Sequence, residues 1–445
     1  MDDRLPQPRD PRQPDTSLVQ EAPAAAAGAT VADVPAPPAD GAPPANGRRH
    51  ALLWTSSAYF GEGLPWTFLH QMATEFLTAI NATKTQTSAT SLLHLAVTFK
   101  FLWSPAVDLV GTRRRWMLAM EVVLGFGMML TGAVIGTDDL TIFWVVLALL
   151  SIIHATHDIA CDGLYLQALD QRSQALFSGT RSAAYRAAML VGSSVLVYLA
   201  GRTSWPLAFF TAGALMLLVA ALNAAALPRA GQTIRRARPR AAEFLEAYRT
   251  FFEQPRAAVV LAFMFFYRLG DIMMLAMAKP LFRDIGIDTA ERGILNGLGA
   301  AAAIAGTVAG GALIARRGLE RCLIPITYLQ NLAIPLYALL SVLKPTFPGV
   351  LAIVIAEQLA AGVGAAAAAV FLMQRTRRAF SASHFAFATA IVSLGSTLSG
   401  FLSGPLNEAV GHTAFFCLAF VASWPSLLLV HAVPRTPVED QSATA

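Results

Sequence analysis

Hydrophobic residues along this chain gather into runs of about 20 positions, which short polar and basic stretches separate. Runs of this length cross a bilayer as helices, whereas a membrane strand needs only about 9–11 residues. Because lipid leaves no backbone polar group solvated, the pattern predicts an all-α integral membrane protein. The twelve predicted spans cover residues 51–74, 88–107, 116–136, 140–160, 176–200, 205–227, 257–280, 291–315, 321–343, 348–371, 382–403 and 411–432.

The polar stretches divide the chain into five parts. Residues 1–47 hold ten of the 25 prolines, and such a segment buries too little apolar surface to fold, so we expect a disordered cytoplasmic tail. The remaining predicted parts are an N-terminal six-helix half over 51–227, a cytoplasmic linker over 228–256, a C-terminal six-helix half over 257–432 and a cytoplasmic tail over 433–445.

Composition supports this class of protein. The chain is 55% hydrophobic and 14% charged, whereas soluble domains average about 45–50% and about 25%. A soluble enzyme, a secreted disulfide scaffold and a nucleic-acid-binding protein are therefore excluded. The three cysteines all lie inside apolar runs and cannot form a disulfide framework.

Basic residues predict the orientation in the membrane. Counted from Arg48 onward, twenty arginines fall in the chain ends and loops of one side, against five Lys and Arg residues on the other side. Since positive charge accumulates in cytoplasmic loops, both termini and the 228–256 linker are predicted to be cytoplasmic.

The two halves repeat one another at an offset of 203 positions. Arg113-Arg114 then coincides with Arg316-Arg317, Gln171-Arg172 with Gln374-Arg375, and Phe177-Ser178 with Phe380-Ser381. Two parallel six-helix halves are the plan of major-facilitator transporters, in which the solute site lies between the halves near the membrane midplane.

Ionisable residues inside spans are candidates for function, because a charge in hydrocarbon needs a partner or a water-filled cavity. Near span ends, the long side chains of Lys100, Lys279 and Glu121 can instead reach the interface. The candidates are Glu62, Lys100, Glu121, Asp158, Asp162, Arg181, Arg186, Arg268, Asp271, Lys279 and Glu357.

The fourth span carries the densest cluster. His154, Asp158, Cys161 and Asp162 share one helix face by their spacing. Three interpretations stay open: structural pairing of the carboxylates with Arg181 and Arg186, a proton or solute contact at Asp158, and a metal site. A membrane enzyme that uses His154, His157, Asp158 and Asp162 is the corresponding alternative function.

Other spans add weaker signals. In span seven, Arg268 and Asp271 stand three residues apart, as helix neighbours that form a pair and that a solute carboxylate can open. In span one, the segment 61–66 (GEGLPW) is expected to bend or interrupt the helix.

The loops carry a second kind of signal. Asp108 with Arg113 and Arg114, and in the second half Arg316 and Arg317, predict a loop motif whose charge pairs lock one access state. No nucleotide-binding loop is present, so transport energy comes from an ion gradient or from the solute's own gradient.

Several of these stretches resemble one family. Lys100–Asp108 (KFLWSPAVD), followed by Arg113–Trp116, resembles the AmpG-type permeases of the peptide/acetyl-coenzyme-A transporter branch of the major facilitator superfamily. His157–Gly163 (HDIACDG) is similar to the branch's fourth-span pattern, and Tyr267–Asp271 (YRLGD) to its seventh-span pattern. Gly310–Leu319 continues the match.

The resemblance implies a proton-driven importer in a bacterial inner membrane, which carries bulky, mostly anionic solutes such as anhydro-muropeptides and serves peptidoglycan recycling. Two positions depart from the family pattern: His157 stands where Gln is usual, and Arg268 where Lys is usual. The alternative solutes are another oligosaccharide, a siderophore or an acyl-coenzyme-A-like molecule.

The predicted solute contacts are Lys100, Arg181, Arg186, Tyr267 and Arg268. The predicted proton-coupling residues are Glu62, His157, Asp158, Asp162, Asp271 and Glu357. We expect no cofactor, no metal and no nucleic acid as a partner. The expected partners are the solute, protons and the lipid bilayer, and we expect a monomer.

Overall fold

The computed structural model describes residues 45–136, 140–169, 171–228, 249, 251–375 and 381–435. By its contacts the chain divides into residues 1–48 and residues 49–445, and the description below concerns the second unit. Most of the predicted N-terminal tail, most of the 228–256 linker and residues 436–445 lie outside the described residues. Every regular element of the described part is helical.

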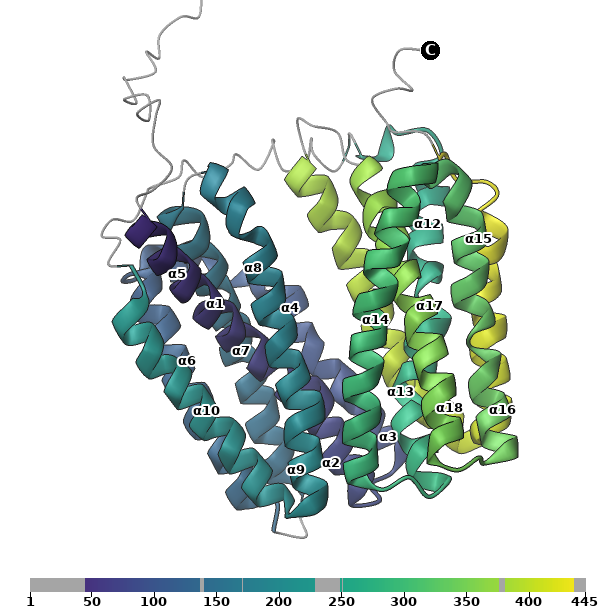
Figure 1. Cartoon of the computed structure of the whole chain (residues 1–445), viewed down its shortest axis with the longest axis horizontal. Coiled ribbons are helices and arrows are strands. Elements are labelled where there is room, and N and C mark those ends of the chain that lie inside the picture. Colours follow the sequence, from purple (N-terminus) through teal and green to yellow (C-terminus); the bar gives the residue numbers. More distant parts are fainter. Residues whose placement is uncertain are drawn as a thin grey trace, which may run out of the picture. The chain divides into compact units, whose positions relative to one another are not determined.

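The first group of helices comes from residues 45–226 (Figure 1). Three of its helical segments contain short π or 3-10 turns, so their elements are given piece by piece. They are α1 (Ala45–Thr67), η1 (Phe68–Met72), α2 (Ala73–Ala79), α3 (Lys84–Ala89), η2 (Thr90–Leu93), α4 (His94–Phe99), η3 (Lys100–Leu102), α5 (Ser104–Leu109), α6 (Arg113–Val134), α7 (Leu140–Ala168), α8 (Gln171–Leu190), η4 (Val191–Leu196), α9 (Val197–Arg202) and α10 (Trp205–Ala226).

The second group comes from residues 257–429. Its elements are α12 (Ala257–Tyr267), α13 (Leu269–Asp284), α14 (Thr289–Arg317), α15 (Leu319–Leu332), α16 (Pro335–Leu343), α17 (Phe347–Gln374) and α18 (Ser381–Leu429). We call the two groups the N-terminal and C-terminal halves. Each half has its own apolar core, around Phe68 and Phe209 in the first and around Phe263 and Phe416 in the second.

Nine helical segments of the described residues are long and apolar enough to cross a membrane. The predicted count of twelve spans is not confirmed by this measure and stays a prediction. The segments 45–79 and 84–109, which contain the first two predicted spans, are not among the nine, and the second is built from pieces of six residues or fewer. The last two predicted spans form one helix, α18, whose backbone breaks at Gly411 (φ 77°).

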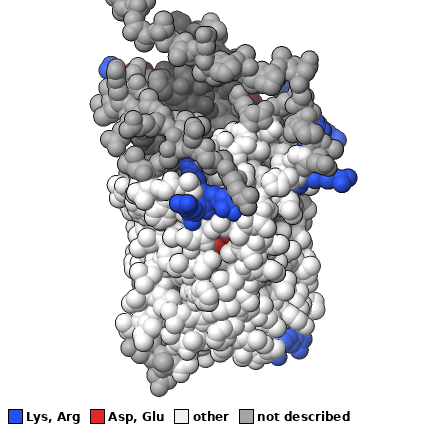
Figure 2. Space-filling model, turned by 90° about the vertical axis from the view of Figure 1, so that its left-hand side faces the viewer, with Lys and Arg blue, Asp and Glu red and all other residues white. Residues whose placement is uncertain are grey.

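The surface agrees with a membrane-embedded bundle. Figure 2 shows a face of the N-terminal half on which most exposed Lys and Arg gather toward the upper end and a smaller group lies at the lower end, with a broad surface almost free of charge between them. Exposed side chains on α6 and α7 such as Phe126 and Leu149 are apolar, as expected where lipid rather than water is the neighbour.

Helix α1 does not break at the expected place. It continues through Pro65 to Thr67, and the irregular π turn follows at residues 68–72. The glycines of the GEGLPW segment serve close packing instead. A Cβ on Gly63 would lie 2.6 Å from the carbonyl oxygen of Tyr185, so only glycine allows α1 and α8 to approach this closely.

The two halves touch each other mainly at one end, which we call the closed end. There α3 contacts α18, α9 and η4 contact α14, and α2 contacts α13. Figure 1 places α2, α3 and α9 at the lower end of the molecule. The opposite end, which we call the arginine end, carries Arg113–Arg115, Arg316, Arg317 and Arg321 at the ends of α6, α14 and α15.

Glycines allow the backbones of the two halves to touch at the closed end. A Cβ on Gly293 of α14 would lie 2.7 Å from the backbone nitrogen of Tyr198 on α9. One on Gly201 of α9 would collide with the backbone of Ala290, and one on Gly404 of α18 with that of Lys84. We call Gly201, Gly293 and Gly404 the glycine seam.

The repeat is visible in the helices, but at a different offset from the sequence identities. Helices α7 and α17 begin at Leu140 and Phe347, which are 207 positions apart. The left-handed glycines Gly111 (φ 73°) and Gly318 (φ 77°) share this separation. The matched arginines therefore lie on opposite sides of the same turn, since Arg113 follows Gly111 and Arg317 precedes Gly318.

Candidate functional site

The first cluster of charges joins three helices of the N-terminal half around Asp162 of α7. Tyr59 of α1 donates a hydrogen bond to Oδ1 of Asp162 at 2.8 Å, and Nη2 of Arg181 on α8 lies 2.9 Å from the same oxygen. The Arg181 guanidinium also stacks on the Tyr59 ring, 4.4 Å from its centroid. The expected pairing of a fourth-span carboxylate with Arg181 is present.

One helical turn away, Asp158 pairs with Lys100 of the 3-10 turn η3. Lys100 therefore does not extend to the membrane interface, which was one of its predicted alternatives. The side chain of Asp158 is 12% exposed and that of Lys100 is 32% exposed. Solvent can reach this pair although it belongs to the interior of two spans.

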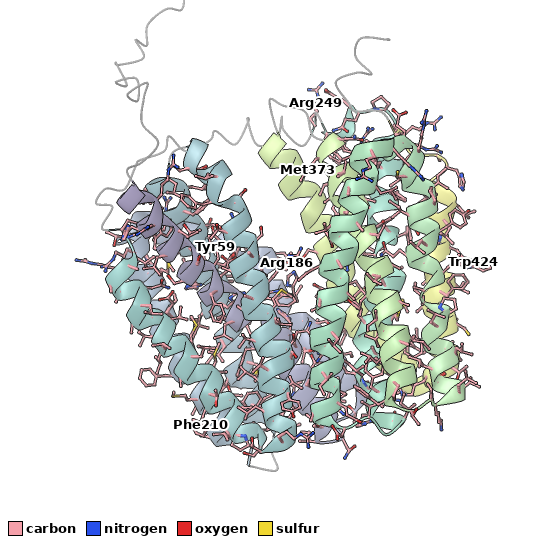
Figure 3. The ribbon with its side chains drawn as sticks, in the orientation of Figure 1. Tyr59, Arg186, Phe210, Arg249, Met373 and Trp424 are labelled. Atoms are coloured by element: carbon pink, nitrogen blue, oxygen red, sulfur yellow. The ribbon has the colours of Figure 1, made fainter. Side chains whose placement is uncertain are left out.

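Glu62 of α1 is buried, and its Oε2 accepts no hydrogen bond in the described part of the protein. An unpartnered carboxylate oxygen in a protein interior is costly, so it calls for a proton or a ligand. Arg186, the other predicted partner of the fourth-span carboxylates, is exposed on α8 and forms no hydrogen bond or ion pair with the described residues. Figure 3 labels it on the side of α8 that faces the C-terminal helices.

His157 and Glu121 form a separate interior network. His157 Nε2 lies 3.2 Å from Oε1 of Glu121, and both side chains are 0% exposed. Asn223 of α10 donates to the same Glu121 oxygen at 2.6 Å, and Ser57 of α1 donates to Asn223 at 2.6 Å. His157 is therefore held among α1, α6, α7 and α10, apart from the partly exposed Lys100–Asp158 pair, and Glu121 does not reach the interface as one expectation had it.

In the C-terminal half, Arg268 and Asp271 form the expected pair, with Nη2 of Arg268 2.8 Å from Oδ2 of Asp271. Arg268 lies between the end of α12 at Tyr267 and the start of α13 at Leu269, so the pair sits where span seven is interrupted. The Asp271 side chain is 4% exposed and that of Arg268 is 35% exposed. Nε of Arg268 has no hydrogen-bond partner among the described residues.

Two further predicted residues of this half differ in what they contact. Glu357 of α17 is buried, and Tyr337 and Gln358 donate to its Oε2 at 3.2 and 2.9 Å, while Oε1 has no partner in the described part. Tyr267 is also buried and donates to the carbonyl oxygen of Gly364 at 2.9 Å. Its hydroxyl thus fastens α12 to α17, an arrangement that favours a structural role over the predicted solute contact.

The arginines of the predicted loop motif make hydrogen bonds in the N-terminal half but not in the C-terminal half, within the described residues. Arg113 donates to the carbonyl oxygen of Gly163 at 3.0 Å, and Arg114 donates to that of Ala224 at 2.6 Å. Arg316 and Arg317 are exposed and make no such bond within the described residues. The Asp108 side chain lies outside those that the structure describes.

Sequence analysis missed the network that joins the halves at the closed end. Glu75 of α2 is 0% exposed, and its Oε2 lies 2.8 Å from Nε of Arg292 on α14, which is 2% exposed. Asn296 of α14 donates to the other carboxylate oxygen at 3.0 Å. Lys279 of α13 lies 3.9 Å from that oxygen and donates to the Gln71 side chain at 2.6 Å.

Position explains why this network was missed. The predicted first span ends at 74, one residue before Glu75, and Arg292 is the second residue of the predicted span 291–315. Both were therefore treated as span ends, and a pair 217 positions apart has no spacing signal of its own. The only signal available in the sequence is a carboxylate in a largely apolar stretch, since Glu75 lies within TEFL (residues 74–77).

No group of three His, Cys, Asp or Glu side chains in the described ranges comes together as a metal site. The chemistry that remains is ion pairing. Carboxylates and cations face one another at mid-span, on helices from both halves of a multi-pass helical bundle, and this arrangement defines a membrane transporter.

The chain belongs to the Major Facilitator Superfamily, which its residues 51–404 match. It is similar to the anhydromuropeptide permease of Escherichia coli (strain K12), with 28% identity over 387 residues that cover 85% of this chain and 78% of that protein. The putative transporter AmpG 4 of Rickettsia conorii is 25% identical over 355 residues, which cover 76% of this chain and 86% of that protein. The resemblance to AmpG-type permeases is thereby confirmed.

Solved structures share the fold. The nucleoside transporter NupG superposes with a TM-score of 0.62 at 15% identity, over 86% of this chain and 98% of its own. A bacterial homolog of the human lysosomal transporter Spinster, in an inward-facing and unoccupied conformation, gives 0.61 at 15% identity, over 86% and 94%. The family assignment also argues against the alternative of a membrane enzyme, because these relatives are transporters.

Proposed function

We propose that this transporter is a proton-coupled importer of bulky anionic solutes, with anhydro-muropeptides as the leading class, across a bacterial inner membrane. The similarity to an anhydromuropeptide permease supports the solute class. The ion pairs at mid-span support both the coupling and the preference for anions.

One observation carries the proposal: charged groups inside spans are about one-third exposed in both halves. The exposed fractions are 32% for Lys100, 38% for Arg181 and 35% for Arg268. A charge cannot face hydrocarbon at this exposure without a large cost, so these side chains line a space that water and solute enter. Three cations on that space suit a solute with carboxylates.

In the Arg268–Asp271 pair, a solute carboxylate can replace the Asp271 carboxylate as the partner of Arg268. The Arg268 guanidinium uses Nη2 for Asp271 and leaves Nε without a partner. Because this Nε is buried, a solute carboxylate approaches through the exposed third of the side chain and binds the guanidinium in place of Asp271. The solute is held without breaking any contact between helices, because Arg268 and Asp271 adjoin one interruption of one span.

The N-terminal pair provides the proton step. Protonation of Asp158 removes its charge and releases Lys100, which then faces the solute as an unpaired cation. Proton binding and anion binding thus favour each other, as coupled uptake requires. With both termini in the cytoplasm, the closed end faces the periplasm, so this conformation is open toward the cytoplasmic side.

Uptake of labelled anhydro-muropeptide into proteoliposomes of the purified protein tests the proposal, with and without an imposed inward proton gradient. We expect accumulation above the equilibrium level only with the gradient, and its collapse when an uncoupler is added. A second outcome is that the muropeptide fails while another anionic oligosaccharide, a siderophore or acetyl-coenzyme A is taken up with the gradient. That result would overturn the proposed solute and support the proposed proton coupling. Equal uptake with and without the gradient would overturn the coupling.

A further inference from the structure

A cavity of about 440 Å³ lies in the C-terminal half, outside the charge clusters described above. Helices α14 and α15 form its two walls, through Gly310, Leu313 and Arg317 on one side and Arg321, Pro325 and Leu329 on the other. Val363 of α17 forms part of its floor. Apart from the two arginines the named lining residues are apolar, and the volume falls in the range of ligand sites.

The walls are continuous helix faces that run inward from the arginine end. The lining positions 310, 313 and 317 recur at helical spacing, as do 321, 325 and 329. From Arg321 to Leu329 the groove extends about 12 Å along α15 at the helical rise of 1.5 Å. This length is most of one leaflet, since the hydrocarbon core of a bilayer is about 30 Å thick.

The groove forms because α14 packs closely against α17, whereas α15 is separated from α14 by a sharp turn. A Cβ on Gly310 would lie 2.9 Å from the Cα atom of Val363, so the glycine draws α14 against α17. Helix α15 begins after the sharp turn at Gly318 (φ 77°) and contains Pro325, which faces the groove. The neighbouring side chains Val308, Leu329 and Leu332 are exposed, so the groove opens toward the lipid phase.

Arg317 and Arg321 stand at the mouth of the groove, on either side of the Gly318 turn. Both side chains are exposed, and neither makes a hydrogen bond or ion pair with the residues that the structure describes. In the N-terminal half, Arg114, which the 203-residue repeat matches with Arg317, donates to a backbone carbonyl instead. Two unpaired guanidinium groups above an apolar slot are complementary to a phosphate that carries an acyl chain.

We propose that this groove binds one anionic phospholipid of the surrounding leaflet. Its phosphate is held between Arg317 and Arg321, and one acyl chain occupies the slot between α14 and α15. Nothing in this assignment depends on the transported solute, because the groove lies on a lipid-facing surface of the C-terminal half and contains none of the mid-span charges.

The test uses the full-length protein in vesicles of phosphatidylcholine, prepared with and without phosphatidylglycerol. After extraction, native mass spectrometry counts the lipids that stay bound. We expect one phosphatidylglycerol per protein, retained in preference to phosphatidylcholine. The double variant Arg317→Gln/Arg321→Gln should bind phosphatidylglycerol about twenty-five-fold more weakly, because each basic residue near a membrane surface contributes about a factor of five.

Two further variants separate the headgroup from the chain. Arg316→Gln is the matched control, since Arg316 is exposed at the same turn but does not line the groove, and it should retain the lipid as the unaltered protein does. Ala309→Phe, at an exposed position on the groove wall, should fill the slot and lower retention of both lipids alike.

Retention of phosphatidylglycerol by the double arginine variant at the level of the unaltered protein would overturn the assignment. So would equal retention of the two lipids by the unaltered protein. A thermal unfolding midpoint unchanged in each variant shows that the loss of lipid is not a loss of fold.

Discussion

The closed-end network and the mid-span pairs are both built from carboxylates and cations, yet they differ in access to water. Glu75 and Arg292 are 0% and 2% exposed, and their pair joins α2 of one half to α14 of the other. Lys100, Arg181 and Arg268 are each about one-third exposed, and their pairs lie within a single half.

The difference separates the charges that hold a conformation from the charges that can exchange partners. A fully buried pair is costly to open, because each group loses its only compensation for desolvation. A partly exposed pair is weak and accepts water or a solute in place of its partner. We therefore assign the closed-end network to joining the halves, and the mid-span pairs to binding and coupling.

The largest effect is expected for Arg292→Ala, which leaves the carboxylate of Glu75 buried with only Asn296 and the distant Lys279 beside it. Removing one partner of a buried pair costs about 3–5 kcal/mol. The denaturant midpoint of the purified protein should fall accordingly. Arg316→Ala, at an exposed arginine outside the lipid groove and without a partner in the described part, is the control and should change stability by about 0.5 kcal/mol or less. Equal effects of the two substitutions would remove the distinction between buried and exposed charges.

Asp158→Asn should abolish gradient-driven accumulation while it changes the unfolding midpoint little, since the Lys100 partner stays partly solvated. Proteoliposome uptake with and without the proton gradient measures this. The control is Glu320→Gln, an exposed carboxylate at the arginine end, which should accumulate solute normally. Uphill transport that survives in the Asp158 variant would exclude Asp158 from coupling.

Arg268→Ala should weaken uptake of anionic solutes and lower stability by about 1–3 kcal/mol, because Asp271 is left buried without its cation. The double variant Arg268→Ala/Asp271→Ala removes both charges, so its folded yield and unfolding midpoint should recover while uptake stays low. If single and double variants unfold at the same midpoint, the two residues are not partners.

The smallest effect is expected for Tyr59→Phe, which deletes the hydrogen bond to Asp162 but keeps the ring beneath Arg181. A single neutral donor to a carboxylate that Arg181 also holds contributes about 1 kcal/mol. The unfolding midpoint should therefore shift slightly, with uptake near that of the unaltered protein. A loss as large as that of Arg292→Ala would place Tyr59 among the structural charges.

Features that arise within one helix or between consecutive helices were predictable from sequence. The Arg268–Asp271 pair follows from three-residue spacing, and the Asp162–Arg181 pair joins consecutive spans. The helical class and the family follow from the lengths of the apolar runs and from motifs such as KFLWSPAVD.

Contacts between distant helices were not predictable from a single sequence. Glu75 meets Arg292 across 217 positions, and His157 meets Glu121 rather than the groups near Asp158, because helix rotation decides which face a residue presents. The interruption of α1 was misplaced for a similar reason. Glycine in that segment serves close approach to α8, and the sequence does not distinguish this role from a bend.

The glycine seam makes the contact between the halves adjustable in small steps. At Gly293 a single added methyl group would already press against the backbone of Tyr198, and Gly201 and Gly404 are crowded in the same way. A larger side chain at any of these positions would push the two halves further apart without changing the packing inside either half. Substitution of Gly201 by alanine, serine and valine in turn would shift the conformational equilibrium progressively toward separation of the two halves at the closed end. The size of the side chain at this position would therefore set how often the closed end opens.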